Sequence, residues 1–256
     1  EPAEGEDIAT FYFLDALTTF VPAAAMTSNY EYFNYTPSAY FVGIGYQDEA
    51  DGVPREHNRT RDYTPTAFAP PDDKHFLSGS PDSYEGSGGA DAFLDVVENE
   101  IIPFVERRYQ VTGDDRVLVG KSMSGLAAVH SLLTRPGLFR RYVIMSPSIW
   151  WDDWFVDRSE RYVMRMAKNT ATAEYPVETR LYLAVGDSEE RFGLVTDLHV
   201  LAHVLRNRRN DNLKVHLEVL AGELHEGIFP TGFMRGIVGV YAGDPDRRPS
   251  ASPVKW

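Results

Sequence analysis

The sequence predicts an α/β protein with a mostly parallel central sheet and helices on both faces. Short apolar runs rich in β-branched and aromatic residues alternate along the chain with longer segments whose apolar residues follow helical spacing. This alternation is typical of parallel sheets, because helices form the crossovers between parallel strands. The 256 residues show no internal repeat and no long linker, which predicts a single domain over residues 1–243 and a proline-containing tail at 244–256.

Each element is predicted from its local pattern. The expected strands are short apolar runs at 8–14, 40–46, 116–119, 141–145 and 180–186, and a segment at 214–220 in which apolar and polar residues alternate. The expected helices cover 89–109, 126–134, 194–209 and 229–241, and Pro103 is expected to kink the first of them. Residues 47–88 are rich in Pro, Asp, Gly and Ser, which predicts a long, mostly irregular loop. Residues 152–178 have partial helical character and are interpreted as a small cap.

The composition argues against several classes of function. A formal net charge of −13 argues against a nucleic-acid partner, since phosphates attract clustered Lys and Arg. No apolar stretch reaches the roughly 18 residues that a membrane span needs. The absence of cysteine excludes disulfides, thiolate catalysis and cysteine metal sites. No signal-peptide pattern stands at residue 1, which slightly favours a cytoplasmic location and leaves a mature secreted or periplasmic form open. The sequence does not determine the oligomeric state.

The segment GKSMS at residues 120–124 carries the strongest sign of chemistry. An apolar run precedes it and a helical run follows it, and a serine on a sharp turn between strand and helix is typical of a nucleophile elbow. The close approach of strand and helix needs small residues two positions before and after the serine, and Gly120 and Ser124 are small. Such a turn exposes Ser122 Oγ and puts the next N–H groups at a helix N-terminus, where an oxyanion is stabilised.

A serine nucleophile needs a base that takes its proton and an acid that orients the base. In chain order the acid is expected after Ser122, and the histidine after the acid, each in a loop that follows a strand. His225 lies in a glycine-flanked loop after the last predicted strand. The loop after the strand at 180–186 offers Asp187, Glu189 and Glu190, of which only one can face His225.

The other histidines are interpreted as structural or solvated. His199 and His203 lie four residues apart on a predicted helix, which is a spacing that could hold a metal. They lack the flanking glutamate of a zinc-protease helix and are interpreted as part of a helix face. We expect no metal and no organic cofactor.

Taken together, several motifs resemble those of the Putative esterase family of α/β-hydrolases over residues 11 to 241. That family includes esterase D-like and feruloyl esterases, enterobactin and salmochelin siderophore esterases, and mycolyltransferases. The motifs stand in the expected order: YFLDA at 12–16, VGIGY at 42–46, RDYTP at 61–65, GGADAF at 88–93, SPSIWW at 146–151, GDSE at 186–189 and LHEGIFP at 224–230. The last three are most similar to the siderophore-esterase branch.

The resemblance implies an α/β-hydrolase fold and particular roles for the site residues. Spacing in the family selects Glu189 as the acid beside Ser122 and His225, and it implies an oxyanion hole formed by the N–H groups of Met123 and Leu17. The chain departs from the family pattern in having Ala16, Lys121 and Ser124 where Gly, His or Gln, and Gly are common. The usual N-terminal strands are also expected to be missing, either through a trimmed chain or a shortened sheet edge.

The substrate pocket is expected over Ser122, with the 47–88 loop and the 146–154 segment as its walls. Within these segments Arg59, Arg61, Trp150 and Trp151 are candidate substrate contacts. For the arginines a solvated loop charge is an equal alternative, and one of the two tryptophans is expected to pack in the core or cap.

The sequence therefore predicts a serine carboxylic-ester hydrolase that forms an acyl-enzyme with a small-molecule ester, such as a siderophore lactone or an aromatic acyl ester. Two alternatives stay open. The same residues would serve an acyltransferase that passes the acyl group to a hydroxyl, and a non-catalytic binding module with the same fold also fits the three departures from the family pattern.

Overall fold

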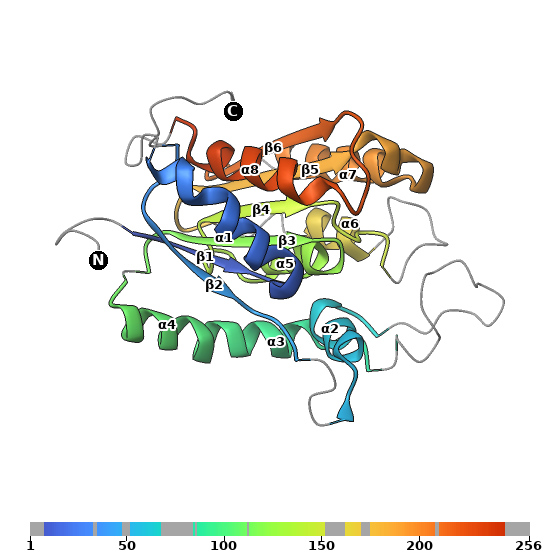
Figure 1. Cartoon of the computed structure of the whole chain (residues 1–256). Helices are drawn as coiled ribbons and strands as arrows, with labels where there is room; N and C mark the ends of the chain where they lie inside the picture. The colour runs from blue at the N-terminus through green and yellow to red at the C-terminus, as the bar shows by residue number, and fades with distance from the viewer. Residues whose placement is uncertain are drawn as a thin grey trace.

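The computed structural model describes residues 8–32, 35–47, 52–67, 84, 86–111, 113–151, 162–169, 175–207 and 210–243. A sheet of six strands lies at the centre with helices on both sides (Figure 1). The strands are β1 (Ala9–Phe13), β2 (Ala39–Gly43), β3 (Arg116–Lys121), β4 (Arg141–Met145), β5 (Thr179–Gly186) and β6 (Leu213–Leu220). All five neighbouring pairs are parallel, which confirms the predicted α/β class.

The strand order is β2-β1-β3-β4-β5-β6, so the chain winds in one direction from β1 to β2 and in the other from β3 to β6. The reversal makes a switch point between β1 and β3, because the connections that leave their carboxyl ends go to opposite faces of the sheet. In the described part of the chain no antiparallel strand joins the sheet, and β2 forms one edge. The carboxyl ends of β1 and β3 are therefore where a ligand site is expected.

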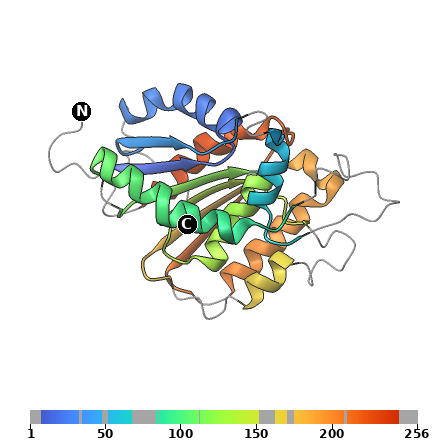
Figure 2. The ribbon, with the colours of Figure 1, turned by 90° about the horizontal axis from the view of Figure 1, so that it is seen from below.

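Two helical layers enclose the sheet, as Figure 2 shows in side view. The first layer is α1 (Ala16–Tyr32) with α8 (Ile228–Tyr241), and the second contains α3 (Ala90–Val96), the π-helical turn η3 (Val97–Ile101), α4 (Ile102–Tyr109), α5 (Met123–Thr134), α6 (Tyr162–Asn169) and α7 (Leu194–Arg206). Alternate strand residues supply the two cores: Phe11 and Phe13 pack towards α1 and α8, while Tyr12 and Leu14 pack towards the opposite layer.

Two helices lie where the sequence predicts none. No element was predicted over Ala16–Tyr32, where helix α1 connects the parallel strands β1 and β2 although Pro22 and the pair Thr18-Thr19 are unfavourable to a helix. The predicted irregular loop at 47–88 contains α2 (Arg55–Tyr63), nine residues with almost no apolar periodicity. Packing against α3 and α5 stabilises α2 in the structure, and local sequence does not report such packing.

The helix predicted at 89–109 is continuous in the structure and contains a π-helical turn near Pro103, where a kink was predicted. This turn, η3, ends two residues before Pro103. Because proline has no N–H and its ring clashes with the carbonyl four residues earlier, the wider π-turn accommodates it without a break in the helix.

The described residues of the predicted cap are 162–169, which form α6, and 175–178. Helix α6 packs on α7 and α5 within the second layer and buries Val163, Met164 and Ala167 there. The remainder of the predicted cap up to residue 174, and the predicted tail at 244–256, lie outside the described residues, so both interpretations stay predictions. No helix among the described residues is long and apolar enough to span a membrane.

The amino ends of the central strands carry a buried ion pair far from the crevice. Arg141 Nε donates to Asp115 Oδ1 at 2.6 Å, and both side chains have 0% exposure. Arg141 also donates to the carbonyl of Val240 at 2.7 Å, while Tyr241 donates to Asp115 at 3.0 Å. This cluster fixes the carboxyl end of α8 to the sheet and thereby helps to anchor the layer that contains α1.

Candidate active site

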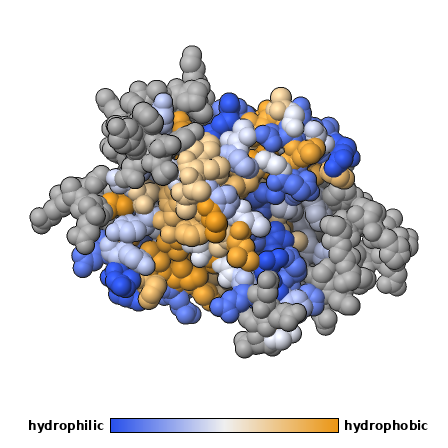
Figure 3. Space-filling view, viewed as in Figure 1, coloured by the Kyte–Doolittle hydropathy of each residue, from blue (hydrophilic) through white to orange (hydrophobic). Residues whose placement is uncertain are grey.

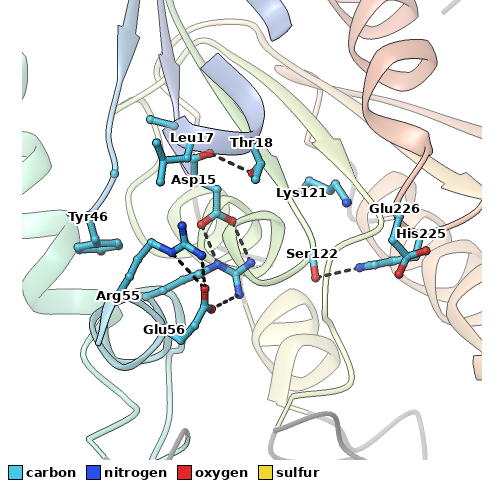
Figure 4. Close-up of a pocket in the computed structure, with 13 residues that line it drawn as sticks. Asp15, Leu17, Thr18, Tyr46, Arg55, Glu56, Lys121, Ser122, His225 and Glu226 are labelled. Carbon is cyan, nitrogen blue, oxygen red and sulfur yellow. Dashed lines mark hydrogen bonds and ion pairs between the residues drawn. The ribbon is translucent and has the colours of Figure 1, made fainter. Parts of the chain in front are cut away.

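The candidate catalytic residues lie together at the carboxyl ends of three neighbouring or near-neighbouring strands. Ser122 directly follows β3, Glu189 lies in the 3₁₀ turn η6 (Asp187–Phe192) after β5, and His225 lies in the loop between β6 and α8. Parallel strands put all their carboxyl ends at one edge, so three segments distant in sequence converge there. Figure 4 shows Ser122 facing His225 across the site.

Ser122 occupies a strained turn between β3 and α5. Its φ of 59° and ψ of −121° are rare for a residue other than glycine. A Cβ at Gly120 would collide with the backbone carbonyl of Ser124, which explains the glycine there. Ser124 Oγ accepts from Lys121 N–H at 3.0 Å and donates to Lys121 C=O at 2.8 Å. The serine in place of the common glycine thus closes the elbow with two hydrogen bonds.

A continuous hydrogen-bond chain joins the three side chains. His225 Nε2 lies 3.0 Å from Ser122 Oγ, and His225 Nδ1 lies 2.6 Å from Glu189 Oε2. With the proton on Nδ1, the imidazole donates to Glu189 and presents Nε2 as the acceptor for the serine hydroxyl. This is the geometry in which histidine acts as a general base on serine.

Glu189 is held as a carboxylate inside the protein. Its side chain is nearly fully buried, and burial alone would raise its pKa. Hydrogen bonds from His225, Ser146 Oγ at 2.6 Å and Gly186 N–H at 2.9 Å outweigh burial and lower the pKa below its ordinary value. A carboxylate fixed by three donors keeps one orientation, so it also fixes the imidazole.

The neighbouring acids have other partners. Asp187 Oδ1 accepts from Gly222 N–H at 2.9 Å, which ties the acid loop to the histidine loop. Glu190 accepts from Thr196 N–H at 2.9 Å in the first turn of α7. Glu189 is therefore the acid, of the three, whose side chain contacts His225.

The residues implied as oxyanion donors begin two helices that open into the same cavity. Met123 is the first residue of α5, and Leu17 is the second residue of α1. N–H groups in the first turn of a helix have no acceptor within the helix, and the helix dipole favours an anion there. Leu17 and Ser122 line one cavity, so both helix ends can serve one oxyanion.

Arg59 of α2 supports this part of the site. Its guanidinium binds Asp15 with two hydrogen bonds, Nε to Oδ1 at 2.7 Å and Nη2 to Oδ2 at 2.9 Å. Asp15, at a φ of 56°, forms the turn immediately before α1, and its N–H donates to Tyr63 OH at 3.0 Å. Arg59 Nη1 also contacts Met123 Sδ at 3.8 Å. Arg59 thus contacts the turn at Asp15, close before Leu17, and the side chain of Met123, so it touches both regions that hold the implied oxyanion donors.

The cavity over Ser122 has a volume of about 350 Å³. The carboxyl ends of β1 and β2, the first turns of α1 and α2, and the loops that hold Ser122 and His225 form its walls: Asp15, Ala16, Leu17, Thr18, Gly45, Tyr46, Arg55, Glu56, Arg59, Lys121, Ser122, His225 and Glu226. The 47–88 segment contributes a wall as predicted. The described residues of the expected wall at 146–154, which are 146–151, do not line the cavity, and the first turn of α1 forms a wall that was not predicted.

Three of the four candidate substrate contacts do not line the cavity, and for Arg61 the reason is that residues 55–63 form a helix. Arg59 lines the cavity, but Arg61 lies about 200° further around α2 and pairs with Asp62 at 2.9 Å. Trp151 is buried, donates to the carbonyl of Thr66 at 3.1 Å and packs beside Tyr84. The sequence predicts that one of the two tryptophans packs in the core or cap, and Trp151 does so.

Trp150 packs against the same core and does not line the cavity. The interpretation of Arg61, Trp150 and Trp151 as cavity contacts is therefore not supported by the described residues.

Sequence reasoning missed the roles of two serines after β4. Ser146, at a φ of 43°, donates to Glu189. Ser148 N–H donates to Ser122 C=O at 3.0 Å, and Ser148 Oγ lies 3.5 Å from Ser122 Oγ. The signal was present, because both serines directly follow a strand next to the elbow. In the described ranges no group of three His, Cys, Asp or Glu side chains is placed to hold a metal ion.

Comparison with known proteins agrees with this geometry. The chain is 31% identical over 194 residues to the ferri-bacillibactin esterase BesA of Bacillus subtilis, an alignment that covers 74% of this chain and 57% of BesA. It is 34% identical over 160 residues to the siderophore enterobactin esterase of Emericella nidulans, covering 59% and 50% of the two chains. The chain thus spans about half the length of these curated relatives.

The structure is also similar to solved structures. The siderophore hydrolase EstB from Aspergillus nidulans superposes with a TM-score of 0.74 at 25% identity, covering 96% of this chain and 86% of EstB. The six-stranded parallel sheet and its two helical layers are an α/β-hydrolase fold. The family model described as Putative esterase matches residues 2–230, nearly the whole described chain, and the protein therefore belongs to the Putative esterase family.

Proposed function

We propose that this protein is a serine carboxylic-ester hydrolase that cleaves the ester bonds of a siderophore. The observation that carries the proposal is the hydrogen-bond chain from Ser122 through His225 to the buried carboxylate of Glu189. A histidine in contact with a half-buried serine on a strained turn and with a fixed carboxylate has one evident use, which is to activate the hydroxyl as a nucleophile. The binding-module alternative gives no reason for maintaining this strain and this buried charge.

The geometry supports a reaction in two halves. Ser122 Oγ attacks the ester carbonyl, and His225 Nε2 takes the hydroxyl proton and then gives it to the departing alkoxide. The N–H groups of Met123 and Leu17 stabilise the oxyanion of the tetrahedral intermediate. In the second half His225 deprotonates a water that attacks the acyl-enzyme, and the acid is released. Glu189 keeps the proton on Nδ1 and stabilises the imidazolium in both halves.

The substrate class comes from the relatives and is supported by the cavity. BesA, the enterobactin esterase and EstB are named for siderophore esters or siderophore hydrolysis. The cavity opens to solvent, so a bulky substrate can reach Ser122, and it combines the exposed Leu17 side chain with charged groups. Figure 3 shows apolar surface over the region of α1, where Leu17 and Val21 are 57% and 61% exposed. This surface would suit the apolar part of such an ester.

The test combines labelling with turnover. A fluorophosphonate should label the wild-type protein once, and the label should map to Ser122. The variant Ser122→Ala should lose both labelling and the hydrolysis of siderophore lactones and aryl esters, by roughly 10⁴-fold or more. Adding alcohols to the assay and measuring transesterified product against free acid separates a hydrolase from an acyltransferase. Full turnover by the Ser122→Ala variant would contradict the proposal.

A further inference from the structure

Lys121 is a cation of the cavity that the reaction described above does not use. It is the last residue of β3 and immediately precedes Ser122, and its side chain lines the same cavity. Figure 4 shows the side chain of Lys121 lying between Thr18 and Glu226, on the side of Ser122 where His225 lies. Only its backbone takes part in closing the elbow, through Ser124 Oγ.

The three cationic side chains of the cavity differ in their partners. Arg59 is held by Asp15 in two hydrogen bonds, and Arg55 Nη2 lies 3.0 Å from Glu56 Oε1. Lys121 Nζ, by contrast, makes no hydrogen bond and no ion pair with any residue that the structure describes. Lys121 is thus the cavity cation whose donors are left for a ligand.

The surroundings of Lys121 favour a partner of negative charge. Its side chain is half-buried, and burial lowers its pKa from the ordinary 10.5, while the carboxylates of Glu226 and Glu189 act in the opposite direction. A partly desolvated ammonium without a hydrogen-bonded counter-ion gains free energy when an anionic oxygen approaches it. Glu226 is exposed on the same wall of the cavity, and its carboxylate is not within ion-pair distance of Lys121 Nζ. It attracts the ammonium over a longer distance and leaves the N–H donors of Lys121 unoccupied.

We propose that Lys121 determines specificity by binding a negatively charged oxygen, a carboxylate or phenolate, that the ester substrate carries close to its scissile bond. The proposal rests on the esterase function proposed above and names the class of ester that this site prefers. Because Lys121 adjoins the nucleophile in the chain, the anionic group must lie near Ser122 when Oγ attacks the ester, on either the acyl part or the alcohol part of the substrate.

Matched substrates test this directly. One pair is 3-acetoxybenzoate and 3-acetoxybenzamide, with charge or no charge on the alcohol part, and the other is 4-(phenoxycarbonyl)benzoate and its carboxamide, with the difference on the acyl part. The measured quantity is the ratio of kcat/KM for the anionic ester to that for its neutral partner. In Lys121→Met this ratio should fall by about 10- to 100-fold for at least one pair, the loss expected for a hydrogen bond to a charged group. Lys121→Arg should retain most of the ratio.

Two further arms separate a specific contact from a general effect of charge. Lys214→Met removes an exposed lysine at the amino end of β6, where Nζ donates to Asp211 C=O at 2.8 Å, and it should leave the ratio unchanged for both pairs of esters. Glu226→Gln should raise the ratio, since it removes the carboxylate that repels an anionic substrate. The wild-type ratio should decline as pH rises, beginning below the ordinary lysine range.

A ratio in Lys121→Met that stays within about twofold of the wild-type value for both pairs would overturn the role of Lys121 and leave the esterase function intact. A wild-type protein that hydrolyses none of the four esters, nor any siderophore lactone, would instead overturn the proposed function, and the inference with it.

Discussion

The substitution Glu189→Gln tests the arrangement of the site most sharply, because the structure fixes how the new amide would lie. Glu189 Oε1 accepts from Gly186 N–H and Ser146 Oγ, at 2.9 and 2.6 Å. In the Glu189→Gln variant the amide oxygen must remain at this position, since an NH₂ group there would face the donor N–H of Gly186. The NH₂ group is then left facing His225 Nδ1 and donates to it. The imidazole proton moves to Nε2, where the ring can no longer accept the proton of Ser122.

The expected loss follows from this wrong tautomer. Replacing a triad acid by its amide lowers kcat by about 10⁴-fold, which corresponds to about 5 kcal/mol of transition-state stabilisation. The assay is kcat and KM on a neutral aryl ester, with circular dichroism and thermal unfolding as controls for folding. KM should change little, because Glu189 does not line the cavity.

The same variant gives a pH signature in stability. The lowered pKa of Glu189 means that its ionised form stabilises the wild-type fold above its ordinary pKa of 4.5, and that this contribution is lost as pH falls through the lowered value. The difference in free energy of unfolding between wild type and Glu189→Gln should therefore be largest above about pH 4.5 and shrink in acid. Asp187→Asn and Glu190→Gln are the matched controls. If Asp187→Asn abolishes turnover while Glu189→Gln retains it within about tenfold, the reasoning is wrong.

Three other predictions concern residues around the site and at the opposite edge of the sheet. Arg59→Met leaves the Asp15 carboxylate without its ion pair, beside the turn that holds an implied oxyanion donor. It should lower kcat by about 10²-fold, as loss of one oxyanion donor does, with little change in KM and partial rescue by Arg59→Lys. A rise in KM of the same size with kcat unchanged would mark Arg59 as a substrate contact. Ser124→Ala removes both side-chain hydrogen bonds of the elbow and should cost about 1 kcal/mol of stability in urea unfolding with turnover retained; inactivation would question Ser122 as the nucleophile. Asp115→Ala strands Arg141 without its counter-ion and should cost about 3–5 kcal/mol, measured by urea unfolding, with activity per folded molecule unchanged; a loss under about 1 kcal/mol would show that the pair is solvated.

The sequence alone determined the features that depend on neighbouring residues. All six strands were predictable, five as the largely apolar runs typical of parallel strands and β6 by its alternation of apolar and polar residues, and each observed strand overlaps its predicted range. The elbow was predictable for a related reason, since strand, strained serine and helix are consecutive and Gly120 meets a local steric need. His225 was identified by its place after the last strand, and the contact with Ser122 agrees with that choice.

Only the tertiary structure decided which side chains meet. Asp187, Glu189 and Glu190 have similar sequence surroundings, and the path of the 3₁₀ turn alone directs Glu189 inward and gives the other two different partners. The site likewise depends on the contact of Arg59 with Asp15, across 44 positions of the chain. Helix α2 forms because it packs on α3 and α5, and because it is a helix Arg59 and Arg61 face different sides. Such contacts depend on free energy gained only when distant segments are packed together, so a local pattern of residues does not encode them.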